Sequence, residues 1–188
     1  LHSRTGSNVM SFGATKLLAA SGGKAYEIDQ SLLFDSGDTA DLTKTMGAGG
    51  NRKTYTISMW LKRTKLGVRQ AFIYGGSDNE NYTTYADFSA NDELDFVFYS
   101  TGTGVIGRLK TNRVFRDIAS WYHVVLAMDT TESTAGDRMR MYINGVEQTS
   151  FSVDTNPSLD SSTHFLNEGF AHYIGNDDVD GYFDGLIA

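Results

Sequence analysis

The order of apolar and polar positions along the chain predicts short strands separated by turns. Between residues 54 and 61 apolar side chains occupy every second position, and threonine or serine fills most of the others. Such alternation is typical of a strand with one buried face, whose side chains point alternately in and out. Residues 122–128 are apolar at nearly every position, so we expect that strand at the centre of a sheet.

Turn signals divide the rest of the chain into similar short runs. Asn144-Gly145 is the strongest hairpin signal, because a type I′ turn needs positive φ at both central residues. Asn91-Asp92 is expected to turn the chain between two further strands, and loops are predicted at 46–51, 101–107 and 155–168. The other strands are predicted at residues 32–34, 71–74, 82–88, 94–99, 139–143, 146–151, 173–174 and 182–188. The whole pattern predicts an all-β protein.

Length, composition and charge narrow the class further. The 188 residues are 40% hydrophobic, which suits one domain with a sizeable core. Cysteine is absent, which excludes a disulfide scaffold and a thiolate metal site. The net charge of −7 disfavours nucleic acid and anionic membranes, which both attract basic surfaces. No apolar stretch is long enough to span a bilayer. We therefore expect no nucleic-acid partner and no membrane insertion.

The beginning of the chain differs in pattern from the remainder. Residues 1–9 are polar and patternless, so we interpret them as left over from cloning. Residues 10–30 are weakly patterned and interrupted by glycines, and they are predicted to form an N-terminal arm over the domain. Residues 31–188 carry the strand signals and form the predicted domain.

Five phrases of the sequence form a recognisable set. They are residues 26–32, 50–54, 114–117, 121–126 and 142–146. With these phrases, the chain from about Ala25 to Ala188 resembles the laminin-G-like jelly rolls of the concanavalin-A-like lectin/glucanase group. More narrowly, it is similar to a version frequent in structural, tail-fibre-like proteins of marine bacteriophages. The resemblance implies an antiparallel β-sandwich of jelly-roll type, placed on a virion surface or outside a cell.

The last phrase, residues 183–188, departs from that group. In such domains it normally continues into a strand that pairs near the N-terminal one, whereas here it stops at Ala188. The closing strand is therefore expected to be truncated or only partly present. An uncovered sheet edge would invite pairing with another chain, so a homo-oligomer is one expected outcome.

The resemblance implies a binding module, often for sugars, and only sometimes an enzyme. A half-exposed tyrosine ring near a strand end can stack on a sugar while its hydroxyl remains exposed to solvent. We expect Tyr82, Tyr85 and Tyr182 to play this part, with Asn176 beside them, and a cell-surface polysaccharide as the partner. The alternative is a purely structural virion decoration or assembly domain that packs against other virion proteins and binds no glycan.

Acidic loops suggest a bound cation. Calcium prefers carboxylate, amide and carbonyl oxygens, and Asp177, Asp178 and Asp180 follow one another closely after a predicted strand. Asp78 lies in a second loop of similar composition. The sequence therefore predicts a Ca²⁺ site at these aspartates. The competing interpretation is that Asn and Asp are present only because they favour turns.

A glycoside hydrolase is the more distant alternative. The jelly-roll glucanases carry Glu-x-Asp on one strand, followed by a second Glu, and here Glu93 and Asp95 match the first part. The positions that would carry the second acid are Val97 and Phe98. A retaining mechanism needs two carboxyl groups about 5–5.5 Å apart, so the motif is incomplete. We predict a non-catalytic protein with Glu93 and Asp95 on the solvated face of their strand.

Overall fold

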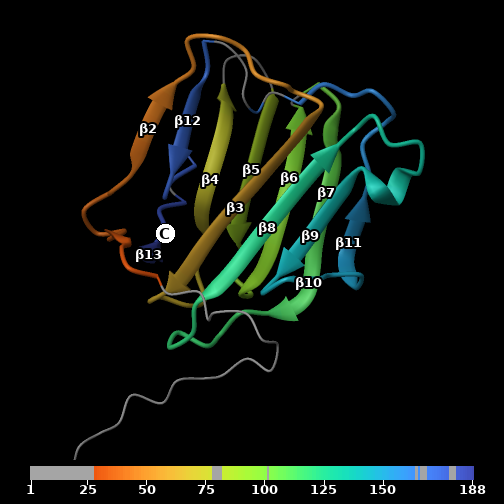
Figure 1. Ribbon diagram of the computed structural model, residues 1–188. Helices are drawn as coiled ribbons and strands as arrows, with labels where there is room; N and C mark the ends of the chain where they lie inside the picture. Colours follow the sequence, from red (N-terminus) through yellow and green to blue (C-terminus); the bar gives the residue numbers. More distant parts are fainter. Residues whose placement is uncertain (1–27, 78–81, 101, 164, 166–168, 178–180) are drawn as a thin grey trace, which may run out of the picture.

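Two antiparallel β-sheets, packed face to face, make up the computed structural model (Figure 1). It describes residues 28–77, 82–100, 102–163, 165, 169–177 and 181–188. One sheet has the order β1 (Leu32–Phe34), β13 (Gly185–Ile187), β3 (Thr54–Arg63), β8 (Tyr122–Asp129), β9 (Met139–Ile143) and β10 (Val146–Glu147). The other has the order β11 (Phe151–Thr155), β7 (Gly104–Val114), β6 (Glu93–Ser100), β5 (Tyr82–Phe88), β4 (Gln70–Ser77), β12 (Ala171–Ile174) and β2 (Leu42–Thr45). The predicted antiparallel β-sandwich is confirmed.

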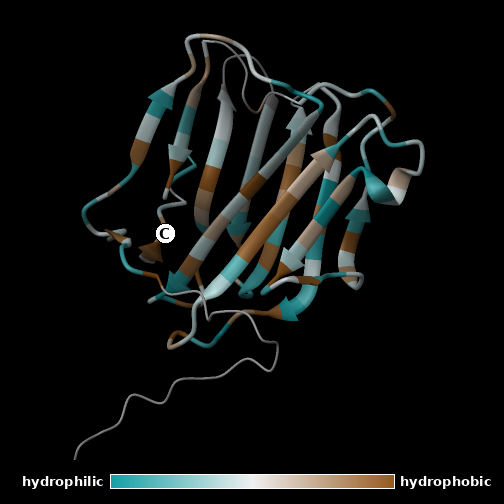
Figure 2. Ribbon diagram, in the orientation of Figure 1, coloured by the Kyte–Doolittle hydropathy of each residue, from teal (hydrophilic) through white to brown (hydrophobic). Residues whose placement is uncertain are grey.

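The core lies between the two sheets and follows the predicted alternation. On β3, Ile57, Met59 and Leu61 are buried, while Thr56 and Ser58, at alternate positions, are exposed. Trp60 breaks the apolar-polar alternation and lies on the outer face, where its ring stacks on His123 at 4.8 Å. Strand β8 lies between β3 and β9, at the interior position that its apolar sequence predicted. Figure 2 shows the brown, hydrophobic segments gathered along these strands.

Three elements differ from the prediction. The span 146–151 is not one strand, because β10 ends at Glu147 and the chain then crosses to the other sheet to begin β11. Strand β7 was not predicted at all, and it begins at Gly104, inside the segment predicted as a loop. Its glycines hide the strand pattern, and its partners β6 and β11 come from other parts of the sequence. Strand β2 was missed because its four side chains are all exposed, which leaves no alternation to detect.

The polar stretch after β11 contributes to the interior more than its composition suggested. Phe165 is buried and its ring lies 5.1 Å from that of Tyr55. The segment is fastened to the rest by Thr163, whose backbone N–H and hydroxyl both donate to the carbonyl of Arg52 at 3.0 and 2.7 Å. The described part of the loop predicted at 155–168, residues 155–163 and 165, therefore packs against the sandwich through Thr163 and Phe165.

Candidate functional site

The outer face of the seven-stranded sheet carries a row of aromatic and basic side chains. Cross-strand pairing aligns five residues along this row, and they alternate with core residues such as Ala86 and Phe96. Because directly paired residues share one face of a sheet, all five side chains belong to the face that points away from the core. They are Tyr173 on β12, Tyr74 on β4, Tyr85 on β5, Val97 on β6 and Arg108 on β7.

A second row beside it is charged. Asp87 on β5 is paired directly with Asp95 on β6, and Asp95 is in turn paired with Lys110 on β7. Like charges directly opposite one another are destabilising unless they are compensated. The two carboxylates are nevertheless nearly buried. Positively charged groups are therefore needed beside them to compensate their charge.

Two arginines supply that compensation. The Arg69 Nε donates to Asp87 Oδ2 at 2.5 Å, and another nitrogen of the same guanidinium donates to Asp177. The Arg108 Nε donates to both oxygens of Asp95 at 2.9 and 3.1 Å. The carboxylate side chains are 5% exposed, whereas Arg69 and Arg108 are 38% and 31% exposed. The guanidinium groups therefore form the accessible surface of the site, and the carboxylates lie beneath them.

Arginine also meets an aromatic ring in this region. The guanidinium carbon of Arg69 lies 5.2 Å from the centre of the Tyr85 ring, within the range of a cation–π contact. The rings of Tyr74 and Tyr173 meet edge to face, with centroids 5.9 Å apart. These contacts hold planar, amphipathic groups in fixed orientations. We call this set of side chains, from Tyr173 across to Arg108 and including Arg69, Asp87 and Asp95, the outer-face array.

Asp87 is a carboxyl group of the array whose acidity is strongly perturbed. Burial raises the pKa of its carboxyl from 3.8 to about 6, although the neighbouring Arg69 opposes the shift. Its folded pKa therefore lies above the ordinary value, and the folded protein retains this proton between about pH 4 and 6. The contribution of this proton to the free energy of unfolding is therefore fully present below pH 4. It is lost as the pH rises through 6.

This shift predicts a titration that can be assigned to one residue. We expect a carboxyl carbon resonance with a midpoint near pH 6 in the NMR spectrum, absent from Asp87→Asn. Between pH 4 and 6 the free energy of unfolding of the wild type should fall by about 2 kcal/mol relative to that variant. An Asp87 midpoint below pH 4.5 would contradict the burial of this carboxyl beneath Arg69.

The array includes one of the four predicted sugar-contacting residues. Tyr85 lies within it. Tyr82 starts β5 and pairs with Ser100, and its side chain is outside the described residues. Tyr182 is half-buried near β13. Asn176 is buried, and its amide donates to Asp41 Oδ2 at 3.1 Å.

The predicted calcium ligands are described only in part. Asp177 is buried, and its carboxylate accepts the backbone N–H of Gly181 at 2.8 Å as well as the bond from Arg69. Asp78, Asp178 and Asp180 lie outside the described residues. Within the described ranges, no group of three His, Cys, Asp or Glu side chains could hold a metal ion. Calcium binding by these loops stays a prediction.

Most of the outer-face array could not be predicted from the sequence. Glu93 and Asp95 were predicted on the solvated face of their strand. They do lie on the face opposite the core, but Asp95 is buried there beneath Arg108, and Glu93 is half-buried and pairs with Lys110 at 2.7 Å. The carboxylate opposite Asp95 is Asp87, which local sequence could not supply because it comes from the neighbouring strand. One feature of the sequence did indicate part of the array. Tyr85 and Asp87 are two residues apart on a predicted strand, so their side chains lie on the same face of the sheet.

Comparisons with known proteins identify the family. A family model described as the concanavalin A-like lectin/glucanases superfamily matches residues 34–188. The chain belongs to this superfamily, and its sandwich is of the laminin-G-like, jelly-roll type. No curated protein matches the chain.

Solved structures share the fold at low sequence identity. Domains LG4-5 of the mouse laminin α1 chain are 14% identical, with a TM-score of 0.60 over 90% of this chain and 43% of that one. Domain 4 of a GH43 extracellular arabinanase from Geobacillus stearothermophilus, in complex with arabinotriose, is 16% identical, with a TM-score of 0.55 over 84% and 66%. The CBM40 of the Ruminococcus gnavus IT-sialidase, bound to α2,3 sialyllactose, is 13% identical, with a TM-score of 0.52 over 79% and 88%.

The chain thus spans less than half of the laminin fragment and about two thirds of the arabinanase domain. In the part of the chain that the structure describes, no helix is long and apolar enough to cross a membrane.

Proposed function

We propose that this protein is a non-catalytic carbohydrate-binding module whose ligand lies on the outer-face array. The observation that carries the proposal is that the half-buried Tyr173 and Tyr85 lie on one sheet face with Arg108 and Arg69, whereas Tyr74 between them is buried and supports their rings from the same row. Tyrosine offers an apolar ring and a polar hydroxyl, and arginine offers several fixed donors. Together they match the apolar ring faces and the hydroxyl groups of a sugar.

The proposed partner is a polysaccharide displayed on a cell surface. If binding to one such site on a sheet face is weak, repeated epitopes on a long polymer compensate through multivalency. Two structural neighbours that share the fold were solved with a bound oligosaccharide, arabinotriose or sialyllactose. The proposed setting is a bacteriophage virion surface or a related extracellular assembly, on the strength of the phrases at residues 114–117 and 121–126.

Glycoside hydrolysis is the second candidate, and the opposition of Asp87 and Asp95 favours it. Glycosidases ordinarily use a pair of carboxyl groups, one of which has a raised pKa, and the pKa of Asp87 is raised to about 6. The arginines argue against catalysis. A nucleophile must approach the sugar carbon, but both oxygens of Asp95 are held by Arg108. Asp87 is similarly covered by Arg69.

A glycan array rich in bacterial surface and algal polysaccharides tests the proposal. We expect specific binding by the purified protein and no release of reducing sugar from the bound glycan. Running the array with calcium and again with a chelator tests the predicted Ca²⁺ site, because loss of binding on chelation would assign a role to the aspartate loops. Absence of binding to every glycan in both conditions would favour the structural virion role. Release of sugar would favour the hydrolase.

A further inference from the structure

The arginines of the outer-face array are already paired with carboxylates of the protein. The Nε of Arg69 donates to Asp87, and its Nη1 donates to Asp177. The Nε and Nη2 of Arg108 both donate to Asp95. A guanidinium recognises a carboxylate or a sulfate through two such parallel N–H donors. Asp95 therefore fills the position on Arg108 that an anionic ligand would take.

The charges of this region leave no positive excess. Beside the array, Lys110 contacts Glu93 at 2.7 Å. Together with the pairs of Arg69 and Arg108, three cationic side chains are bound to four carboxylates, in a chain whose net charge is −7. These pairs are far closer than the Debye length of about 8 Å at physiological ionic strength, so each carboxylate compensates its cation directly. An anionic glycan therefore gains no net attraction here.

The donors that remain suit uncharged acceptors. Within the described residues, Nη1 of Arg108 makes no hydrogen bond, and the side chain is 31% exposed. It can donate single hydrogen bonds to hydroxyl or ring oxygens, which have lone pairs but no charge. Tyr85, half-buried in the same row, supplies an apolar ring surface. This combination fits a neutral sugar.

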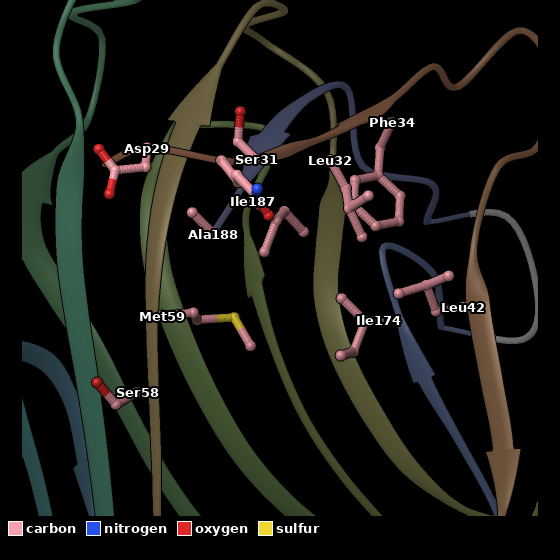
Figure 3. A pocket seen from close by; sticks show the side chains of 11 residues that line it. Asp29, Ser31, Leu32, Phe34, Leu42, Ser58, Met59, Ile174, Ile187 and Ala188 are labelled. Carbon is pink, nitrogen blue, oxygen red and sulfur yellow. The ribbon is translucent and has the colours of Figure 1, made fainter. Parts of the chain in front are cut away.

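An acidic glycan finds no favourable charge in the cavity that Figure 3 shows either. This cavity measures about 710 Å³ and is lined mainly by apolar side chains from both sheets, among them Met59, Ile174 and Ile187. Of the described residues that line it, only Asp29 is charged, and it is acidic. The exposed guanidinium groups of the array are therefore the more favourable place for an anion, and there the carboxylates oppose it.

We propose that the outer-face array selects neutral glycans over acidic ones, and that the carboxylates paired with its cations, Asp95 above all, set this specificity. The inference rests on the proposed carbohydrate-binding function and adds the class of ligand. Asp95 is a positioning residue that acts through Arg108 and needs no contact with the sugar. A guanidinium released from its carboxylate would attract an anion by charge complementarity.

Two forms of one polysaccharide test the selectivity of the wild type. The neutral glycan that binds best on the array is compared with the same glycan after partial oxidation of its primary hydroxyl groups to carboxylates. We expect the oxidised form to bind about threefold more weakly or worse at low salt, and the difference to shrink in about 500 mM NaCl, because salt screens the repulsion. Affinity for the neutral form should change by about twofold or less over the same range.

The outcomes of this comparison separate the two proposals. Preferential binding of acidic glycans, or tenfold weaker binding of the neutral form at high salt, would overturn the selectivity and leave the carbohydrate-binding function standing. Absence of binding to both forms would overturn the carbohydrate-binding function and the selectivity with it.

Asp95→Asn tests the residue assigned to this specificity. We expect the ratio of acidic to neutral affinity to rise about tenfold, because Arg108 then carries an uncompensated charge at the surface. Glu147→Gln is the matched control, since it removes an equal charge from β10 in the other sheet, and it should leave the ratio unchanged. An unchanged ratio in a folded Asp95→Asn protein would overturn the assignment.

A second variant covers the case in which Asp95→Asn does not fold. Glu93 is half-buried, and Glu93→Gln releases Lys110 beside the array. The ratio of acidic to neutral affinity should rise by about threefold, less than for Arg108 because an ammonium is a point charge without a planar fork. A ratio equal to that of the wild type would overturn the role of the paired carboxylates.

Discussion

Replacing Asp92 by Asn is expected to lower the free energy of unfolding by about 3–5 kcal/mol, because it leaves a buried cation without its partner. Arg63 is fully buried, and its Nη2 donates to Asp92 Oδ1 at 3.0 Å. Its other nitrogens donate to the Gln70 side chain and to the carbonyl of Phe115. These neutral acceptors can share the charge but cannot neutralise it.

Asp92 accepts hydrogen bonds from several donors at once. It also accepts the backbone N–H of Gly67 at 2.9 Å and the Nε of Arg116 at 2.9 Å. Burial tends to raise the pKa of this carboxyl, but these hydrogen bonds and the charge of Arg63 together hold it below its ordinary value. The carboxylate therefore joins the segments around β3, β4, β6 and β7 at one end of the sandwich.

Asp92→Asn removes the negative charge of this side chain while keeping its size and shape. Asp92 has a φ of +66°, a conformation that asparagine also tolerates, so the backbone need not change. Urea denaturation measures the effect, and Arg116→Gln is the matched control. Arg116 is the exposed partner of the same carboxylate, at 60%, so its loss should cost no more than about 1 kcal/mol. Equal effects of the two variants would contradict the assigned role of Arg63.

Gly185→Ala is expected to cost about 2–4 kcal/mol, through backbone strain and a steric clash. Gly185 has a φ of +149°, and a Cβ there would lie 2.1 Å from the carbonyl oxygen of Lys62. That oxygen belongs to the neighbouring strand, so β13 would have to move away from β3.

Gly47→Ala is the matched control, since a Cβ at Gly47 meets nothing within 4 Å. Its effect should stay within about 0.5 kcal/mol. Thermal or urea unfolding of both variants makes the comparison. A Gly185→Ala protein as stable as the wild type would show that the β13 pairing contributes little to the fold.

Sequence periodicity was sufficient for the sandwich but not for the order of its strands. The alternation on β3 and the apolar run on β8 predicted both strands and their buried faces, because each pattern is local. The assignment of 146–151 to one strand failed because the chain changes sheets after Glu147. No local pattern records that change.

The site was harder to predict for a similar reason. Tyr85 was identified from its position on a predicted strand, but its neighbours Tyr74, Tyr173 and Arg108 come from three other strands. Which residues become neighbours depends on the register between strands, and a shift of one residue would send each side chain to the other face. The buried arginine Arg63 gave no signal either, because an Arg at a strand end is ordinarily exposed.

The measurement that tests the central claim most directly is a calorimetric titration of the glycan that binds best on the array. The account predicts that Tyr85→Ala weakens binding at least tenfold, which corresponds to about 1.4 kcal/mol. Tyr142→Ala, a half-buried tyrosine on β9 in the other sheet, should bind as the wild type does. Full affinity in Tyr85→Ala, with a properly folded protein, would contradict a binding site on the outer face of the seven-stranded sheet.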